Sequence, residues 1–377
     1  MENVFDLAVV GAGIAGMTVA NKLSQAGINV VVLEKARGTG GRLSSKRWHV
    51  REGHSLAFDL GAPSFQSQTQ QFEDAIDHWR SHGWVTHYEQ SLASQGSLWV
   101  PVPRSSALTR QLARGCELIC GVKVSELIRQ AEGWQLNGWV QRNAPQPQTN
   151  ETEQATELVR AKHVILACPA EQTCELLPAG SPLTTTLSSV QAKPQFVYAL
   201  AFEESVLETH LRSNTLDVSA WLSPLIKQEG VQRVSLESSK PERDELGYKV
   251  VTVALSYAAS QAMVESKDSD EGNHFSETGF PGWVASLLSL KPDFVLRHRW
   301  LYSRYPYEAR LPYGYLEDQS GVWVCGDYFM AMEVEGDSSV ESAYLSATAL
   351  ADAWLTHYRQ QMPVDASSTE NREERSA

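Results

Sequence analysis

A glycine-rich turn near the N-terminus constrains the fold of this chain more than any other feature. Residues 5–10 form an apolar run that leads into Gly11, Gly13 and Gly16, and apolar residues then recur at helical spacing over Met17–Ala26. Gly11 allows a tight turn, Gly13 lets the backbone approach a phosphate, and Gly16 lets the helix pack closely on the strand. The pattern predicts a buried strand followed by a helix whose first amides face a pyrophosphate.

A second apolar run, Asn29–Leu33, ends at Glu34, where this kind of unit places the acid that binds a ribose hydroxyl. Strand, glycines, helix, second strand and acid all occur in order, which disfavours a chance glycine turn. The unit predicts an adenine dinucleotide and does not choose between NAD and FAD. The residues expected to contact it here are Gly11, Ala12, Gly13, Ile14, Ala15, Gly16 and Glu34.

Further motifs carry a family resemblance. The Gly-Gly-Arg-Leu-Ser-Ser run that starts at Gly40, followed by Phe58–Ala62, resembles the FAD-binding segments of flavin amine oxidases, and most closely their renalase-like branch. The resemblance continues in order along the chain and covers most of the FAD-binding part, whereas residues 180–290 are similar only in general pattern. The later matching segments are Trp134, Val164–Ala170, His298–Trp300, Val324–Asp327 and Val340–Ala347.

The resemblance implies a non-covalently bound FAD. Asp327 is expected to bond the ribityl chain, because the matching aspartate does so in that family. The remaining residues that the resemblance places at the cofactor are Lys35, Gly41, Arg42, Leu43, Gly61, Ala62, Val124, Gly326, Val340 and Glu341.

The segment Ser338–Glu341 has the spacing of a capping box and predicts a helix start. In the resembled family the positive end of this helix faces the flavin, where negative charge gathers on reduction. The alternative is that Ser338 only caps a surface helix.

The expected fold is α/β, with a Rossmann-type, glutathione-reductase-like FAD-binding domain and an interleaved α+β substrate domain that contains an antiparallel sheet. The order of the motifs makes both domains discontinuous. We expect residues 1–63, 101–179 and 291–360 in the FAD-binding domain, residues 64–100 and 180–290 in the substrate domain, and 361–377 as a disordered tail.

Composition excludes several function classes. A net charge of −13 offers no basic stripe for a nucleic acid. Five cysteines, an odd number in apolar surroundings, predict reduced thiols in a cytoplasmic protein. No spacing predicts a metal site, and His78 and His82 are interpreted as a solvated helix face. No segment is long and apolar enough to predict a membrane span.

The aromatic-rich run after residue 299 supplies the candidate catalytic residues. Trp300 and Tyr302 are predicted to form a wall that faces the flavin, and Arg299 and Arg304 could bind a phosphate or carboxylate. The alternative is that the aromatics fill a sheet core and the arginines are solvated.

Three functions follow as hypotheses. The resemblance favours an FAD-dependent oxidase that takes hydride from a dihydronicotinamide, with isomers of NAD(P)H among the candidates, and reduces molecular oxygen to hydrogen peroxide. The second is a flavin amine oxidase for a small amine, and the third is a module that binds FAD or NAD(P) without turnover. The expected partners are thus a small-molecule substrate and oxygen, with no nucleic acid and no membrane.

Overall fold

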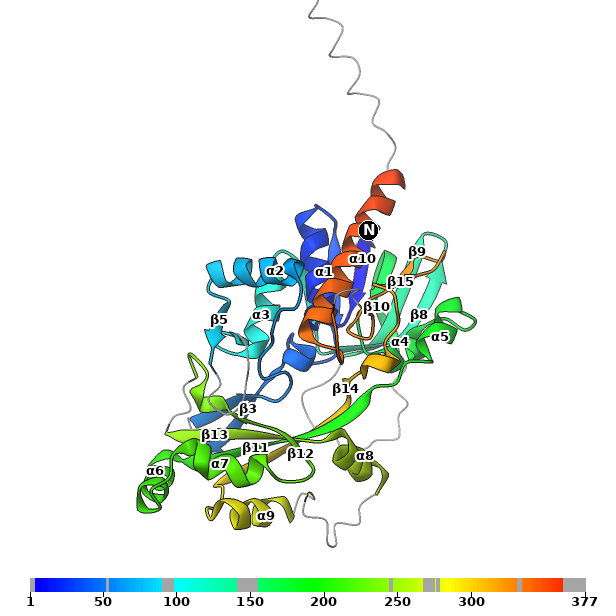
Figure 1. Cartoon of the computed structure of the whole chain (residues 1–377). Coiled ribbons are helices and arrows are strands. Elements are labelled where there is room, and N and C mark those ends of the chain that lie inside the picture. Colours follow the sequence, from blue (N-terminus) through cyan, green and yellow to red (C-terminus); the bar gives the residue numbers. More distant parts are fainter. Residues whose placement is uncertain are drawn as a thin grey trace, which may run out of the picture.

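The computed structural model describes residues 4–51, 54–89, 98–140, 155–243, 247–266, 275, 279–330 and 334–361. The chain forms two sheet-based parts, with β1 and α1 in the upper part of Figure 1 and β11–β14 in the lower part. The predicted tail lies outside the described residues, except that Gln361 ends the last helix.

The first sheet has eight strands and is parallel at its centre. β1 (Val4–Val10) pairs in parallel with both β2 (Val30–Glu34) and β10 (Thr156–Leu166). The main strand order is β15-β16-β10-β1-β2-β7, and the β8–β9 hairpin joins through antiparallel pairing of β9 with β10. The remaining strands are β7 (Glu117–Cys120), β8 (Val122–Gln130), β9 (Gly133–Val140), β15 (Leu316–Glu317) and β16 (Val322–Val324).

Helices cover one face of this sheet, and the β8–β9 hairpin with two short helices packs on the other. Met17, Val19 and Ala20 of α1 (Ile14–Gln25) are buried in one core with Ala347 and Trp354 of α10. That core also contains α2 and α3, so four helices share this side. The other helices named here are α2 (Gln70–Ser81), α3 (Ser105–Leu112), α4 (Ala170–Leu176), α5 (Pro182–Leu187) and α10 (Val340–Gln361).

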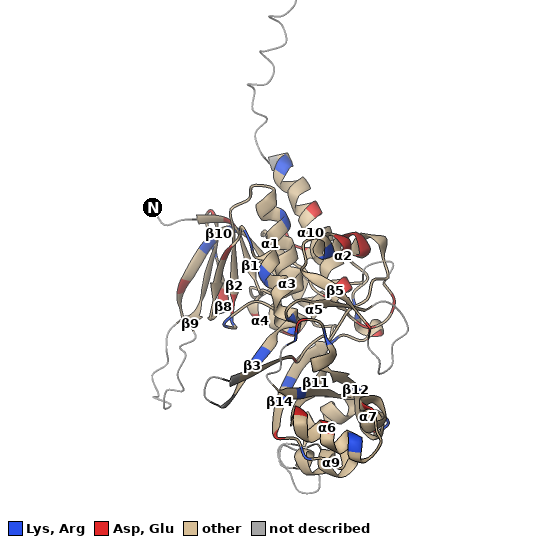
Figure 2. Cartoon of the chain, turned by 90° about the vertical axis from the view of Figure 1, so that its left-hand side faces the viewer, with Lys and Arg blue, Asp and Glu red and all other residues tan. Residues whose placement is uncertain are grey.

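The second sheet has four antiparallel strands in the order β12-β13-β11-β14. Its outer face carries helices, and Phe280 of α9 stacks on Tyr198 of β11 with ring centroids 3.6 Å apart. Figure 2 shows these helices at the end of the molecule away from α1 and α10. The bounds are β11 (Lys193–Glu203), β12 (Val231–Leu236), β13 (Tyr248–Leu255), β14 (Phe294–Arg304), α6 (Glu204–Ser213), α7 (Val218–Ile226), α8 (Tyr257–Glu265) and α9 (Gly279–Leu288).

A hairpin from the first part covers the inner face of the second sheet. Leu56, Phe58 and Leu60, in and just after β4 (His54–Asp59), pack on Val197 of β11 and Ala254 of β13. The two parts therefore share a hydrophobic core. β4 pairs with β3 (Ser45–Arg51), and β5 (Val85–Tyr88) pairs with β6 (Leu98–Pro101). The short 3-10 helices are η1 (Gly41–Leu43), η2 (Glu237–Ser239) and η3 (Tyr307–Ala309).

Buried charges join the same two parts. Asp59 Oδ2 pairs with Arg243 Nη2 at 2.7 Å and lies 3.5 Å from Lys240 Nζ, and Lys240 also pairs with Glu237 at 2.7 Å. Burial alone would raise the pKa of Asp59, but Lys240 and Arg243 outweigh burial and lower it to about 2. The end of β4 is thereby fixed against the segment that follows β12.

Two segments pack differently from the expected domain bounds. Residues 291–360 were assigned to the FAD-binding domain, but β14 (Phe294–Arg304) pairs with β11 in the second sheet. Residues 64–100 were assigned to the substrate domain, but Phe72 and Trp79 of α2 pack in the core with α1. Gly121, with φ of +75°, separates β7 from β8. Among the described residues, no helix has both the length and the hydropathy that a membrane span requires.

Candidate dinucleotide-binding site

The first glycine turn has the geometry that its spacing predicts. Gly11 has φ of +106°, and a Cβ there would lie 3.0 Å from the Ala167 carbonyl oxygen of the strand beside it. A Cβ on Gly16 would collide with the Gly11 carbonyl. Gly11 and Gly16 are therefore required by close packing between β1, α1 and β10.

Gly13 differs from Gly11 and Gly16, because the space that its side chain would occupy is open. A Cβ on Gly13 would meet only the Gly41 Cα, at 4.0 Å. Gly13 is the N-cap of α1, and no side chain caps the helix. The amides at the start of α1 are thus left for another acceptor, as a bound pyrophosphate requires.

Glu34 lies at the end of β2, beside this turn. Its Oε2 accepts a hydrogen bond from the Ala12 N–H and its Oε1 accepts one from the Ala36 N–H, both at 2.7 Å. The buried carboxylate therefore holds the turn against β2. Each oxygen keeps a second lone pair, so the position still suits a ribose hydroxyl donor.

The second glycine cluster packs on the first. The Gly40 N–H donates to the Ala12 carbonyl at 2.9 Å, and a Cβ on Gly41 would lie 3.1 Å from the Gly13 Cα. Residues 11–16 and 40–42 thus form one continuous backbone surface, although no sequence rule relates their positions.

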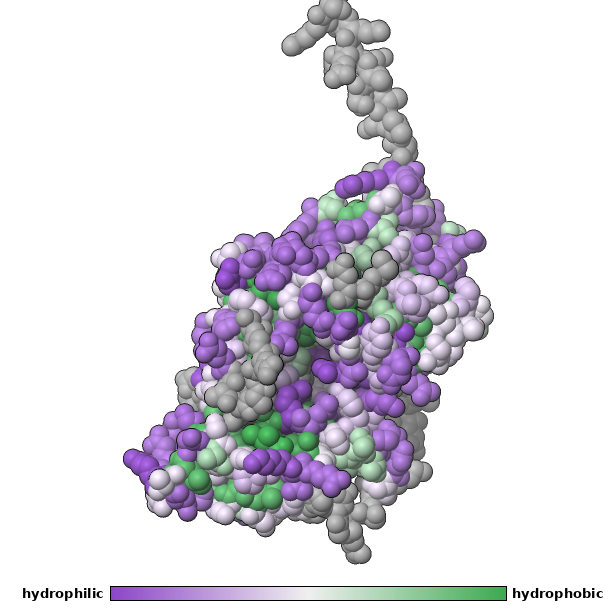
Figure 3. Space-filling model, in the orientation of Figure 1, coloured by the Kyte–Doolittle hydropathy of each residue, from purple (hydrophilic) through white to green (hydrophobic). Residues whose placement is uncertain are grey.

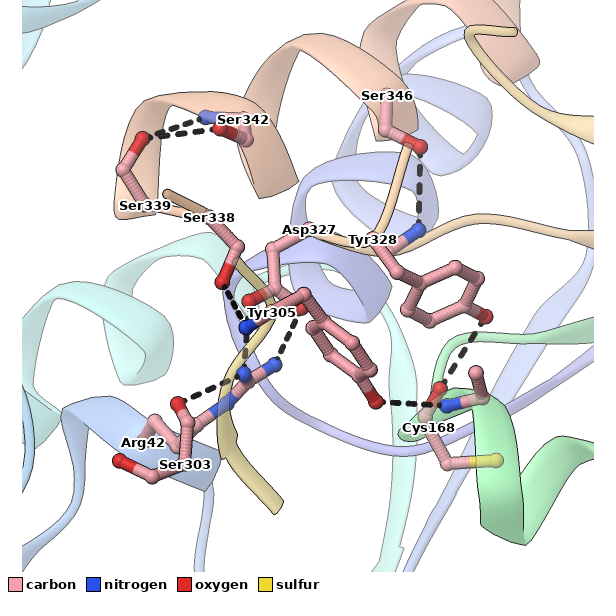
Figure 4. A network of polar contacts seen from close by, with 12 residues as sticks. Arg42, Cys168, Ser303, Tyr305, Asp327, Tyr328, Ser338, Ser339, Ser342 and Ser346 are labelled. Carbon is pink, nitrogen blue, oxygen red and sulfur yellow. Dashed lines mark hydrogen bonds and ion pairs between the residues drawn. The ribbon is translucent and has the colours of Figure 1, made fainter. Parts of the chain in front are cut away.

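Arg42 makes a two-point ion pair with Asp327 (Figure 4). Nη1 donates to Oδ2 at 2.7 Å and Nη2 to Oδ1 at 2.6 Å, while Nη1 also lies 3.2 Å from the Ser303 carbonyl. Asp327 was expected to bond the ribityl chain, and here both of its oxygens bind Arg42. Its ribityl role stays a prediction.

Tyr305 lies buried beside this pair and connects three segments. Its N–H donates to Ser338 Oγ at 2.9 Å, and its hydroxyl accepts from the Ala170 N–H and donates to Glu171, both at 2.9 Å. Burial, then the charge of Asp327, raises the pKa of this hydroxyl well above its usual range. Tyr305 is thus a neutral positioning group within the aromatic-rich run that follows residue 299.

The start of α10 corrects the proposed capping box. The cap is Ser339, whose Oγ accepts from the Ser342 N–H at 3.1 Å, whereas Ser338 Oγ binds Tyr305 (Figure 4). The helix begins one residue later than the predicted Ser338 cap requires, and Ser339 makes no capping box, because Ser342 and not Glu or Gln lies three residues after it.

Glu341 binds another helix instead of its own. Its carboxylate accepts from the Thr69 N–H at 2.8 Å, Thr69 Oγ1 at 2.6 Å and the Gln68 N–H at 2.9 Å. Thr69 is the N-cap of α2, so Glu341 joins the starts of α2 and α10. Its side chain is fully engaged there, and any contact with a cofactor would come from its backbone.

Arg310 is a further cation at the start of α10. Its guanidinium donates to the carbonyls of Gly336 and Phe329, both at 2.8 Å, and to Ser342 Oγ at 3.0 Å. Sequence reasoning did not identify it.

The other predicted contact residues are distributed around this surface. The Gly61–Ala62 segment docks on η1, since the Ala62 N–H donates to the Arg42 carbonyl at 2.9 Å and a Cβ on Gly61 would collide with that oxygen. The Gly326 N–H donates to Ser346 Oγ at 3.1 Å. Of the rest, Lys35 is exposed, Leu43 and Val124 are buried, Val340 is half-buried, and Ile14 and Ala15 begin α1.

Trp300 and Tyr302 contact different neighbours. Trp300 Nε1 donates to the Leu60 carbonyl at 2.9 Å, on the inner face of the second sheet. The pKa of the Tyr302 hydroxyl is raised by burial and by Glu175 and Glu171 of α4. The two rings were predicted to form one wall, and that role stays a prediction.

Arg299 and Arg304 also lie in different surroundings. Arg299 is exposed and pairs in register with Phe196, whose ring belongs to the outer core of the second sheet. Arg304, which ends β14, is half-buried and lies close enough to Arg233 to influence the pKa of Arg233.

Within the described ranges, no group of three or more His, Cys, Asp or Glu side chains could hold a metal ion. All five cysteines are free, and burial raises the pKa of Cys168 to about 11. His78 and His82 are exposed on α2 with ring centroids 4.4 Å apart.

Comparison with known proteins supports the architecture. Residues 9–79 match the family model of the NAD(P)-binding Rossmann-like domain. Among solved structures, a protein described as a protoporphyrinogen oxidase from Exiguobacterium sp. is similar over 95% of this chain and 100% of its own, with a TM-score of 0.62 and 10% identity. A putrescine oxidase variant with redesigned cofactor binding is similar over the same shares, with a TM-score of 0.61 and 13% identity. The predicted Rossmann-type dinucleotide-binding domain is confirmed, and the chain shares its fold with these two proteins.

Proposed function

We propose that this protein is an FAD-dependent oxidase that takes hydride from a dihydronicotinamide, with oxygen as the electron acceptor. The observation that carries the proposal is the open backbone surface at Gly13, which joins an uncapped helix start to Glu34 on one side and to the Gly40–Gly41 turn on the other. The names of both structural neighbours are those of oxidases, which supports the same reaction class.

The residues fit a dinucleotide with a flavin at its far end. The start of α1 would bind the pyrophosphate, and Glu34 the adenosine ribose. Arg42, Asp327 and the start of α10 lie beyond the second glycine turn, where the flavin end is expected. The choice of FAD over NAD rests on the resemblance of the segments around Gly41, Gly61 and Gly326.

The bound flavin would supply a hydride acceptor that can pass two electrons to oxygen. The overall reaction converts dihydronicotinamide, oxygen and one proton into oxidised nicotinamide and hydrogen peroxide. The protein positions the donor: the hydrogen bond from Trp300 to Leu60 fixes the indole on the inner face of the second sheet. The space-filling view is hollowed between the two sheet-based parts, on the side where a donor could enter (Figure 3).

Cofactor binding is tested with Gly13→Ala. The added methyl meets only the Gly41 Cα at 4.0 Å, so we expect normal folding but loss of flavin from the purified protein. The matched control is Gly282→Ala at an exposed position of α9, where nothing lies within 4 Å of the added methyl. Flavin is measured by absorbance after denaturation. Wild-type protein that takes up no flavin, even on reconstitution, would overturn the proposal.

The reaction is tested by anaerobic titration of the flavin-loaded protein with NAD(P)H, its isomer mixture and a panel of amines, followed by air. Bleaching by a dihydronicotinamide, with recovery and peroxide in air, supports the proposal. Bleaching by amines alone would move the protein to the amine oxidases. Bleaching by none of them would favour a flavin without turnover and would also contradict the proposal.

A further inference from the structure

The inner face of the second sheet carries a cation, Arg233, close to the segment that follows β4. Arg233 of β12 pairs in register with Ala254, which belongs to the core between this sheet and β4. Within the described part of the chain, no carboxylate forms an ion pair with Arg233. Among the described residues it makes one long contact, from Nη2 to the Gly61 carbonyl at 3.5 Å, which is the upper limit for a hydrogen bond. A guanidinium has five N–H donors, so most of its capacity is unused.

The position of Arg233 relates it to the candidate catalytic face. The Gly61 carbonyl that Arg233 approaches follows the Leu60 carbonyl that Trp300 binds at 2.9 Å. Arg233 and Trp300 therefore approach consecutive backbone carbonyls, from opposite edges of the second sheet. Gly61 itself packs on Arg42, beside the second glycine turn.

A second cation lies near Arg233. Burial first, and then the positive charge of Arg304, lowers the pKa of Arg233 to about 10. Arg233 still carries its charge at neutral pH. The charge of Glu237 raises the pKa of Arg233, but this carboxylate already pairs with Lys240 at 2.7 Å and accepts a hydrogen bond from the Asp59 N–H at 3.2 Å.

The backbone places the two arginines near each other. Ser303 Oγ donates to Gln195 Oε1 at 3.3 Å, and Gln195 Nε2 donates to Gln232 Oε1 at 2.7 Å, so one side chain joins the residues that directly precede Arg304 and Arg233. Like charges in such a half-buried place are unfavourable without an anion.

We infer that Arg233 and Arg304 form a subsite for a phosphate group of the substrate, next to the face that Trp300 lines. This inference rests on the proposed function, because the phosphate is that of a nicotinamide nucleotide whose ring meets the flavin. Two guanidinium forks match the oxygens of a phosphate, and they would repel the ammonium group of an amine substrate. The subsite therefore selects phosphorylated dihydronicotinamides over amines.

Flavin-loaded enzyme tests the subsite with three hydride donors: NADH, reduced nicotinamide mononucleotide and reduced nicotinamide riboside, which lacks the phosphate. For Arg233→Gln and Arg304→Gln we expect KM to rise about 10- to 100-fold for the two phosphorylated donors. We expect kcat to stay within about twofold and KM for the riboside to be unchanged. Arg233→Lys should recover part of the loss, and Arg212→Gln on exposed α6 is the control with the same charge change.

Calorimetry provides a readout without turnover. Inorganic pyrophosphate should bind the flavin-loaded wild type, and Arg233→Gln should weaken this binding about 10-fold or more. If all three donors have the same KM, or if Arg233→Gln leaves pyrophosphate binding intact, the subsite is overturned while the oxidase stands. If no dihydronicotinamide reduces the flavin, the proposed function fails, and the inference falls with it.

Discussion

The guanidinium of Arg42 and the carboxylate of Asp327 form two parallel hydrogen bonds of 2.7 and 2.6 Å, although the residues are 285 positions apart in the chain. This pair connects the second glycine turn to the end of β16. It joins the first third of the chain to the last, at the place where the flavin end of a dinucleotide is expected.

Asp327→Asn should destabilise the protein by about 1–3 kcal/mol, because it leaves the Arg42 charge without its partner. The loss is below that of a fully buried pair, since the Arg42 side chain is 30% exposed while that of Asp327 is 6% exposed. Urea unfolding measures the change. A double-mutant cycle with Arg42→Met isolates the coupling, and a coupling energy of zero would show that the pair does not contribute to stability.

Gly16→Ala should destabilise the protein by about 1–3 kcal/mol or more, because the new methyl would collide with the Gly11 carbonyl and push α1 away from β1. Thermal unfolding and flavin content should both fall. Gly13→Ala, by contrast, should lower only the flavin content. Equal stability losses in the two variants would contradict the packing described for the turn.

Glu341→Gln should release the start of α2. An amide presents a donor where the carboxylate now accepts bonds from Gln68 and Thr69, and we expect a cost of about 2 kcal/mol. Hydrogen exchange should increase over the first turn of α2. Thr69→Ala removes the cap and one of these bonds and should cost about 1 kcal/mol. Unchanged exchange in Glu341→Gln would refute this link between α2 and α10.

His298 should make stability depend on pH in mild acid. Burial, and then the charge of Lys46, lowers its pKa to about 4 from the ordinary value of 6.5. Below pH 6.5 the unfolded chain binds the proton more readily than the folded chain does. The stability of wild type relative to His298→Asn should thus be constant above about pH 7, fall between pH 6.5 and 4, and level off below 4. Denaturant unfolding across this range measures it, and a flat difference would contradict the assigned environment.

Local signals in the sequence predict the βαβ unit well. The turn at Gly11, the helix after it and the position of Glu34 all follow from steric rules that act over a few residues. Packing of α2 against α1 could not be predicted, because its apolar face would fit either of the two sheet-based parts.

Contacts between distant segments leave no such signal. The pairing of Arg42 with Asp327, the binding of Glu341 to Thr69 and the approach of Arg233 to Gly61 each depend on how complete elements pack. From their charge alone, Arg299 and Arg304 were equally good candidates to bind a phosphate or carboxylate. The register of β14 against β11 distinguishes them, by placing Arg299 opposite Phe196.

The packing of α10 on α1 also has a consequence for biosynthesis. Met17 and Ala20 of α1 are synthesised long before Ala347 and Trp354, whose side chains share their core. The apolar side of α1 facing α10 therefore stays uncovered until α10 has been translated. A nascent chain interrupted before Val340 would present this uncovered surface to chaperones and proteases, whereas the second sheet, completed by Arg304, could already be folded.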